Sequence, residues 1–296
     1  MSDYIVRATA ANGQIRAFAS TTKELCETAR QIHGTSPVGT AALGRLLTGA
    51  GMMGNMMKNK EDLLSIILNA DGPMGKTGVT ANANAEVKGY ISNPDFQNPL
   101  NYFGKLDVGG AVGNGTLKVI KDMGLKEPYI GQTALITGEI AEDLTYYFAT
   151  SEQVPTSVAL GVLINTDNSV KQAGGFIIQL MPFAEDSVID QLETNIKELT
   201  SVTALLEEGL SPKQILKKIL GKFNPEFSET IPTCYKCNCS REKVSKVLLS
   251  VGRKELESMI ADGEPIEVKC HFCNTCHVFS IDELKKLLTY SQQSHS

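Results

Sequence analysis

The sequence predicts three parts: an α+β N-terminal domain with largely antiparallel sheets (1–183), a helical linker (184–231) and a small cysteine-rich C-terminal domain (232–296). Six of the seven cysteines lie in the last part, and only Cys26 lies elsewhere. Strand-like apolar runs separated by turn sequences fill the first part, whereas apolar residues recur every three or four positions in the second. These two observations define the boundaries.

The N-terminal part predicts mostly strands. The expected strands are IRAFAS (15–20), LLSIILN (63–69), VKGYIS (87–92), TALITGEI (133–140), LTYYFATS (144–151), VALGVLIN (158–165) and GGFIIQLMP. Two helices are expected, one from a cap near Ser20 or Thr21 to His33 and one, rich in Ala, Gly and Met, over about 38–57. Turn sequences such as DGPMG and NTDNS bound the runs, and regular helices do not alternate with them. This pattern favours an α+β domain.

The linker predicts amphipathic helices. Its first stretch repeats apolar residues at helical spacing: Val188, Leu192, Ile196, Leu199, Val202 and Leu206. A further helix begins at SPKQ, where Ser211 is the N-cap, Pro212 takes the first helical position and Gln214 completes a capping box. We expect the apolar face of this linker to be removable.

Charge and hydropathy exclude two classes of partner. With 28 Lys and Arg against 33 Asp and Glu, the net charge of −5 gives no general attraction to nucleic acid or anionic membrane. A membrane span is not expected, since there is no run of eighteen apolar residues. The start, MSDYIVRATAANGQ, lacks the features of a secretory signal, so a cytoplasmic location, where thiols stay reduced, is expected.

The cysteine clusters predict a metal. TCYKCNCS (233–240) carries three cysteines, and CHFCNTC carries three more about thirty residues later. In a reducing compartment such clusters bind metal more often than they form disulfides, and so small a domain is marginal on its apolar core alone. Zinc held by four thiolates would stabilise it. The sequence therefore predicts a small C-terminal zinc-binding domain with one zinc ion per chain and four thiolate ligands.

Spacing leaves the ligand set open. Two C-x2-C knuckles are available as Cys234/Cys237 with either Cys270/Cys273 or Cys273/Cys276, and the alternative joins Cys237/Cys239 to Cys270/Cys273. The interleaved His271 and His277 are expected to face solvent. Short helices are expected at about 241–249, 254–261 and 281–289, the last with a capping box of Ser280 and Glu283.

Conventional catalysis is not indicated. The chain has no H-E-x-x-H, P-loop or G-x-S-x-G motif, and its GGAVGNG does not follow a convincing dinucleotide-binding strand. We therefore expect a protein that is not an enzyme. A thiol oxidoreductase using a C-x2-C pair is a lower-ranked alternative, because the motif lies in a metal-like cluster.

KCNCSRE (236–242), followed by CHFC (270–273), resembles the C-x-C…C-x2-C signature of the heat shock protein 33 family of redox-regulated bacterial chaperones. YISNP, GKLDVGGAVGNGTLKVIKDMGL, TYYFATSEQVPTSVALGVLIN and AGGFIIQLMP extend the resemblance over essentially the whole chain. The resemblance implies four zinc ligands: Cys237, Cys239, Cys270 and Cys273. Cys234 and Cys276 are additions to the common pattern and candidates for accessory thiols, whereas Cys26 is expected in the core.

The resemblance also implies an ATP-independent holdase that binds unfolding client proteins. Its reduced, zinc-bound form would be inactive, and Cys237–Cys239 and Cys270–Cys273 disulfides would form as zinc leaves. A homodimer is expected on oxidation. The competing interpretation is a constitutive zinc-ribbon binding protein whose zinc is purely structural.

Two regions are candidates for the client surface. Four methionines are expected along one face of a helix: Met52, Met53, Met56 and Met57. A core or dimer contact is the favoured interpretation of these methionines, because buried methionines are more common than client-binding ones. The stronger candidate is the linker, with Leu192, Ile196 and Leu199.

Overall fold

The computed structural model of the chain describes residues 2–97, 100, 104–228 and 230–293. The chain divides into two compact units, Met1–Lys236 and Cys237–Ser296. Segment 184–231 belongs to the first unit. Among the described helices, none combines the length and the apolar character that crossing a membrane requires.

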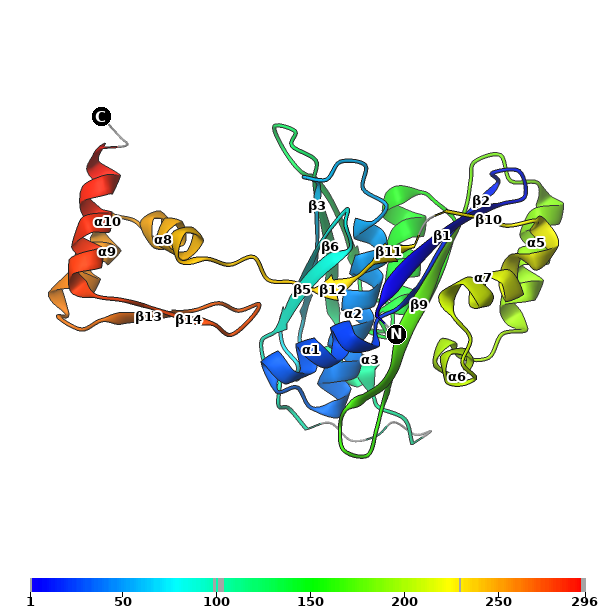
Figure 1. The fold of residues 1–296 in the computed structure, drawn as a ribbon, viewed down its shortest axis with the longest axis horizontal. Helices are drawn as coiled ribbons and strands as arrows, with labels where there is room; N and C mark the ends of the chain where they lie inside the picture. The colour runs from blue at the N-terminus through cyan, green and yellow to red at the C-terminus, as the bar shows by residue number, and fades with distance from the viewer. Residues whose placement is uncertain (1, 98–99, 101–103, 229, 294–296) are drawn as a thin grey trace. The chain divides into compact units, whose positions relative to one another are not determined.

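Two six-stranded sheets form the frame of the first unit (Figure 1). The first has the order β10 (Glu226–Phe227), β1 (Tyr4–Ala10), β2 (Ile15–Thr21), β9 (Val170–Leu180) and β8 (Thr156–Ile164), with β11 (Ile231–Pro232) also pairing β1. The second runs β12 (Cys234–Tyr235), β5 (Glu86–Ile91), β4 (Thr77–Asn82), β3 (Leu63–Ala70), β6 (Gly115–Asp122) and β7 (Tyr129–Ala134). All these pairs are antiparallel except β12 with β5. The prediction of an α+β fold with largely antiparallel sheets is confirmed.

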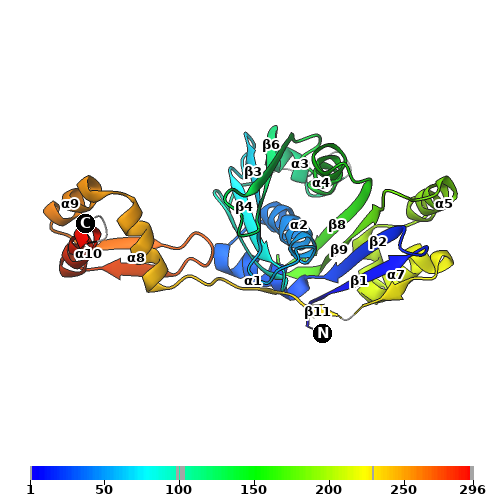
Figure 2. The ribbon, with the colours of Figure 1, turned by 90° about the horizontal axis from the view of Figure 1, so that it is seen from above.

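Helix α2 (Pro37–Gly54) lies between the two sheets (Figure 2). Its N-cap Ser36 accepts a hydrogen bond from the Gly39 N–H, and Pro37 takes the first helical position. A Cβ atom at Gly44 would lie 2.9 Å from the Val162 side chain, and one at Gly49 would lie 2.8 Å from Leu144. The glycines of α2 therefore allow neighbouring elements to approach closely. Helix α1 (Lys23–His33) packs beside α2.

Two predicted strands are corrected by the structure. LTYYFATS (144–151) lies in helix α4 (Ala141–Tyr147) and the π-helix Phe148–Glu152, and only the start of TALITGEI lies in a strand. The buried Asp143 carboxylate explains the difference, because it accepts hydrogen bonds from the backbone N–H groups of Ile136, Thr137, Gly138 and Ile140. It thereby holds a tight turn that begins a helix. A short helix, α3 (Val108–Val112), precedes β6.

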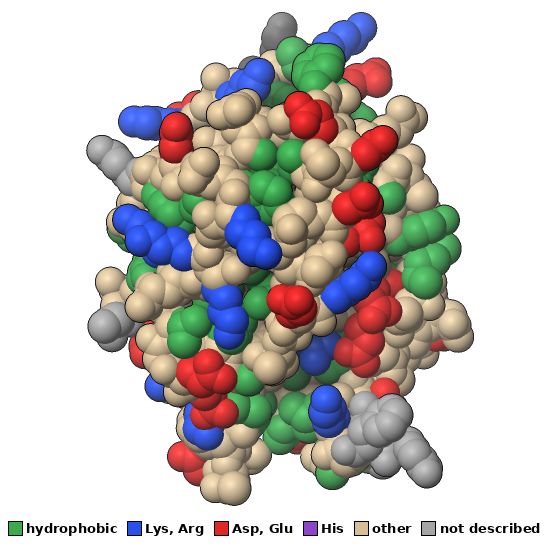
Figure 3. Space-filling view, turned by 90° about the vertical axis from the view of Figure 1, so that its right-hand side faces the viewer, with side chains coloured by type: hydrophobic (Ala, Val, Ile, Leu, Met, Phe, Trp, Pro, Cys, Tyr) green, Lys and Arg blue, Asp and Glu red, His purple; other side chains and the backbone are tan. Residues whose placement is uncertain are grey.

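The linker segment forms three helices: α5 (Asp186–Lys197), α6 (Val202–Glu207) and α7 (Pro212–Leu220). The expectation of one continuous helix through Leu206 is wrong, since α5 ends at its C-cap Glu198 and Ser201 caps α6 anew. The predicted capping box of Ser211 and Gln214 is present. The helices bury their apolar side chains against the sheet face of Val6, Ala17 and Ile178. Figure 3 shows charged side chains among smaller apolar patches on the outer surface.

The second unit contains α8 (Arg241–Ser250), α9 (Arg253–Ala261), the hairpin β13 (Ile266–Lys269) and β14 (Cys276–Phe279), and α10 (Ile281–Gln293). The three predicted helices are present, and Ser280 and Glu283 form the expected reciprocal hydrogen bonds. The hairpin was not predicted. The buried core of the second unit contains five apolar side chains among the described residues: Val244, Leu248, Leu256, Phe279 and Leu284.

Candidate metal centre

Four cysteines of the second unit converge on one point. The sulfur atoms of Cys237, Cys239, Cys270 and Cys273 all lie within 4.8 Å of one another. The Sγ atoms of Cys237 and Cys270 are 3.8 Å apart, and those of Cys239 and Cys273 are 3.3 Å apart. All four side chains are half-buried. Among the described residues this is the one group of His, Cys, Asp or Glu arranged to hold a metal ion.

Two short segments position these thiols. Cys237 and Cys239 directly precede α8, whose N-cap Ser240 accepts a hydrogen bond from the Lys243 N–H. Cys270 follows β13, and Cys273 lies in the tight turn that leads to β14. That turn is held by bonds from Cys270 N–H to Thr275 O and from Asn274 N–H to Cys270 O. Local backbone geometry thus fixes the C-x2-C pair.

The geometry fits zinc. Four sulfurs about 2.3 Å from a tetrahedral zinc ion stand roughly 3.8 Å from one another. The sulfur separations of 3.8 Å and 3.3 Å are close to this value. The close contacts run between the C-x-C and C-x2-C pairs, as expected when both pairs face one central point.

The thiols differ in proton affinity. Burial raises the pKa of Cys237. A hydrogen bond with Cys273, followed by burial, raises the pKa of Cys239. At Cys273, burial raises the pKa. Hydrogen bonds with the Thr275 hydroxyl and backbone and with neighbouring thiols outweigh this effect and lower the pKa to about 6. Thr275, which sequence reasoning missed, therefore favours the thiolate form that binds metal and reacts with oxidants.

The other cysteines lie outside the group. Cys234 is exposed on β12, and Cys276 is exposed on β14. Cys26 is buried between α1 and α2, where burial raises its pKa to about 12. Cys26 therefore lies in the core, as expected.

The histidines also lie outside the four-residue group. His271 is exposed, as expected. His277 is half-buried, so it faces solvent only in part. Its Nε2 atom is buried and has no hydrogen-bond partner among the described residues.

The methionine candidates are not a single helix face. Met52 and Met53 are only 0% and 2% exposed and belong to the central core, whereas Met56 and Met57 follow the end of α2 and are half-buried. This arrangement reflects the packing of α2 between two sheets. Met52 and Met53 are inaccessible in this form.

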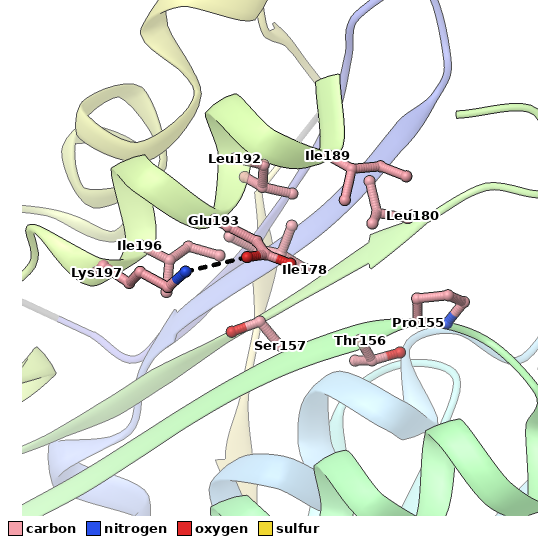
Figure 4. A pocket seen from close by; sticks show the side chains of 10 residues that line it. All are labelled: Pro155, Thr156, Ser157, Ile178, Leu180, Ile189, Leu192, Glu193, Ile196 and Lys197. Atoms are coloured by element: carbon pink, nitrogen blue, oxygen red, sulfur yellow. Dashed lines mark hydrogen bonds and ion pairs between the residues drawn. The ribbon is translucent and has the colours of Figure 1, made fainter. Parts of the chain in front are cut away.

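The linker candidates line a groove. Leu192 and Ile196 of α5 face Ile178 and Leu180 of β9 across a cavity of about 250 Å³ (Figure 4). An ion pair between Glu193 and Lys197 lies at its edge. Leu199 follows α5 and is packed against the same apolar cluster.

The fold and the site define a class of protein: an α+β domain with two largely antiparallel sheets, followed by a module in which four thiols are clustered within metal-binding distance. A family model described as Hsp33 protein matches residues 3–280. The 33 kDa chaperonin of Lachnoclostridium phytofermentans is 60% identical over 98% of this chain and 100% of its own length. That of Agathobacter rectalis is 58% identical over 97% of this chain and 100% of its own.

The solved structures give the same answer. The crystal structure of the 33 kDa chaperonin (heat shock protein 33 homolog) from Thermotoga maritima shares 38% sequence identity and a TM-score of 0.91. The match covers 99% of this chain and 100% of that one. The chain therefore belongs to the Hsp33 family.

Proposed function

We propose that the chain is a redox-regulated, ATP-independent holdase chaperone that binds unfolding proteins under oxidative stress. The single observation that carries the proposal is the convergence of four thiols in a unit with only five described buried apolar side chains. A unit of this kind depends on its metal for folding, and its ligands are oxidisable. Family membership supports the chaperone activity.

In the reduced form the proposed ligands are Cys237, Cys239, Cys270 and Cys273. Zinc, when bound, keeps these four thiols deprotonated and ties the segment before α8 to the β13–β14 turn. The Thr275 hydroxyl holds Cys273 in place with a 3.2 Å hydrogen bond. The reduced module thus stays folded, and the chaperone stays inactive.

Activation oxidises the thiols in two pairs, Cys237 with Cys239 and Cys270 with Cys273. In each pair two thiolates form one S–S bond and give up two electrons. A peroxide accepts them and, with two protons, becomes water; hypochlorite becomes chloride and water. Each disulfide removes two ligands, so a fully oxidised module retains only its small apolar core. The pairing rests on the family resemblance.

The route from module to client surface begins at residues 231–236, here called the strap. Its β12 adds to the edge of β5, the Tyr235 hydroxyl donates to the Gly89 carbonyl over 2.7 Å, and Thr233 donates to Ala85. The strap ends directly before Cys237, so a melted module no longer restrains its end. The strap is attached through two strands of only two residues each, β11 and β12.

Release then extends to the linker helices. Full separation of α5–α7 from the sheet exposes a large apolar cluster. The free-energy cost is about 1.5–3 kcal/mol for each buried aliphatic side chain that becomes exposed. We therefore propose stepwise release, in which Leu192, Ile196 and Leu199 and the sheet face beneath them become the client surface. A client contacting the same apolar surface offsets the cost of its exposure.

The remaining features of the proposal follow the family. The clients are unfolded proteins, the oxidised form is a homodimer, the site of action is the cytoplasm, and no enzymatic step is involved.

Light scattering of a denatured client tests the proposal. The reduced, zinc-loaded protein should leave aggregation unchanged, and the hypochlorite-oxidised protein should suppress it. Cys239→Ser with Cys273→Ser removes two of the proposed ligands, so this variant should suppress aggregation to the same extent with and without oxidant. Cys276→Ser, an exposed thiol outside the group, is the matched control and should behave as the parent chain. Equal suppression by the reduced and oxidised forms of the parent chain would contradict the proposal and favour a constitutive binding protein with structural zinc.

A further inference from the structure

A second cavity, which unlike the α5 groove contains two arginines, lies in the first unit where β1, β2 and the end of α2 meet the linker strand β10. Its volume is about 420 Å³. The side chains that define it are Arg7 and Arg16, with Phe18, Asn55, Met56 and Glu226. None of these residues belongs to the cysteine group or to the α5 groove.

Strand register places the two arginines around one aromatic ring. Arg7 lies opposite Phe18 and Thr9 lies opposite Arg16 in the β1–β2 ladder, so all four side chains share one face of the sheet. The guanidinium carbons of Arg7 and Arg16 lie 5.9 Å and 5.8 Å from the centre of the Phe18 ring. The cavity therefore combines two cations with an apolar, planar surface.

Both guanidinium groups are held by neutral partners. Arg7 donates to the side-chain and backbone oxygens of Asn55, the C-cap of α2, and Arg16 donates twice to Gln179 Oε1. Neither arginine forms an ion pair within the part of the chain that the structure describes. A guanidinium has five N–H donors, so several on each side chain remain for a ligand.

The electrostatic state of the pair favours an anion. Burial, then the charge of Arg16, lowers the pKa of Arg7; burial lowers the pKa of Arg16, and the charge of Glu152 opposes this. Glu152 is itself paired with Lys121. The carboxylate that lines the cavity, Glu226, belongs to an exposed residue of β10. Two partly desolvated cations with one carboxylate at the rim leave an excess of positive charge.

We propose that this cavity binds the phosphate group of a small phosphorylated molecule, with Arg7 and Arg16 on the phosphate and an aromatic or apolar part of the ligand against Phe18 and Met56. Arginine forks match phosphate oxygens with two parallel hydrogen bonds. A dianionic phosphate neutralises both guanidinium groups, which a monoanionic carboxylate does not. The preformed bonds to Asn55 and Gln179 reduce the entropy cost of binding.

The cavity has a consequence for regulation that rests on the proposed function. One wall is β10, which pairs Phe227 with Ala8, and the Ser228 N–H donates to the Arg7 carbonyl. A ligand that needs this wall binds the attached linker better than the released linker, and so shifts the population toward the inactive form. Phenyl phosphate should therefore slow activation by oxidant.

Calorimetric titration of the reduced, zinc-loaded full chain tests the site directly and does not depend on chaperone activity. Phenyl phosphate should bind one site per chain, more tightly than inorganic phosphate and at least about tenfold more tightly than benzoate. Arg16→Gln should weaken binding at least about tenfold, and Glu226→Gln should strengthen it. The control is Arg241→Gln, because Arg241 also lies over a phenylalanine ring, at 4.4 Å from Phe279, but is paired with Glu283.

Equal binding of benzoate and phenyl phosphate would overturn the phosphate assignment. Unchanged affinity for phenyl phosphate in both Arg16→Gln and Glu226→Gln would overturn the site. So would a loss of phenyl phosphate binding when chloride replaces the buffer anion at the same ionic strength. Glu226 is exposed, so Glu226→Gln should fold like the parent chain. This variant therefore still tests the site if Arg16→Gln does not fold.

Discussion

The two units are stabilised by different means. The first unit buries a helix between two sheets and a second apolar cluster beneath α5–α7. The second buries five described apolar side chains and gathers four thiols. If the four thiols hold a metal, as proposed, its loss would remove a large part of the stabilisation of the second unit and very little from the first. Under the proposed function, this difference would let an oxidant melt one unit and leave the other folded.

Metal removal should produce the largest contrast between the units. Structural zinc in small domains contributes about 10–16 kcal/mol of apparent binding energy, most of which appears as folding energy. A chelator added to the reduced protein should therefore unfold the module. Limited proteolysis should then cut within 241–289 and spare the strands around α2. Cleavage at equal rates in both units would show that they do not differ in this way.

Truncation of the first unit's core should have the next largest effect. Leu46 is fully buried within α2, so Leu46→Ala should lower the free energy of unfolding by about 2–5 kcal/mol. Denaturant unfolding measures this change, and zinc affinity should stay the same. Leu63→Ala, at an exposed position of β3, is the control and should cost much less. A parallel loss of zinc affinity in Leu46→Ala would show that the units are energetically coupled.

Asp3 should make the first unit sensitive to pH. Burial raises the pKa of Asp3 to about 6, although hydrogen bonds from the N–H groups of Leu25 and its neighbours act in the opposite direction. The folded state then binds the proton more tightly than the unfolded state, so stability falls as pH rises from about 4 through 6. The difference in unfolding free energy between the parent chain and Asp3→Asn should change by about 2–3 kcal/mol over this window.

Asp262→Asn, at an exposed residue of the second unit, is the matched control for this titration. It should leave the pH dependence of the first unit unchanged. A pH dependence in Asp3→Asn equal to that of the parent chain would rule out Asp3 as its source.

The strap should show the smallest effect. Tyr235→Phe removes the hydroxyl that contacts Gly89 and His33, at a cost of about 1 kcal/mol. The Lys236 amide, which donates to Val87, should exchange its hydrogen about fivefold faster. The control is Tyr129→Phe, because Tyr129 lies on the edge strand β7 and its hydroxyl donates to the Ser151 carbonyl, far from the strap in sequence. No change at Lys236 would mean that the hydroxyl does not fix the strap.

Local signals in the sequence predicted a large part of the fold. The boxes at Ser211 and Ser280 determine helix starts through hydrogen bonds three residues apart, so they are readable without tertiary information. LTYYFATS misled because its aromatic and β-branched residues favour a strand, whereas the helix is set by Asp143 and by burial of Tyr147 and Phe148. Tertiary packing determined that segment.

The candidate metal site was also predicted only in part, because local spacing can be read from the sequence and long-range contacts cannot. Spacing identified a cysteine-rich metal module but left three ligand sets open, and the structure brings one set together. Residues far apart in sequence escaped prediction. The parallel pairing of Cys234 and Tyr235 with Glu86 and Val87 spans about 150 positions, and no local pattern encodes it.

Hydrogen exchange measured before and after hypochlorite treatment tests the central claim most directly. Amides of α8, α9 and the β13–β14 hairpin should lose protection together as zinc is released, the strap should follow, and the strands around α2 should stay protected. Retention of protection throughout residues 241–289 in a fully oxidised, zinc-free protein would contradict the account, because the thiols would then be dispensable for folding the module.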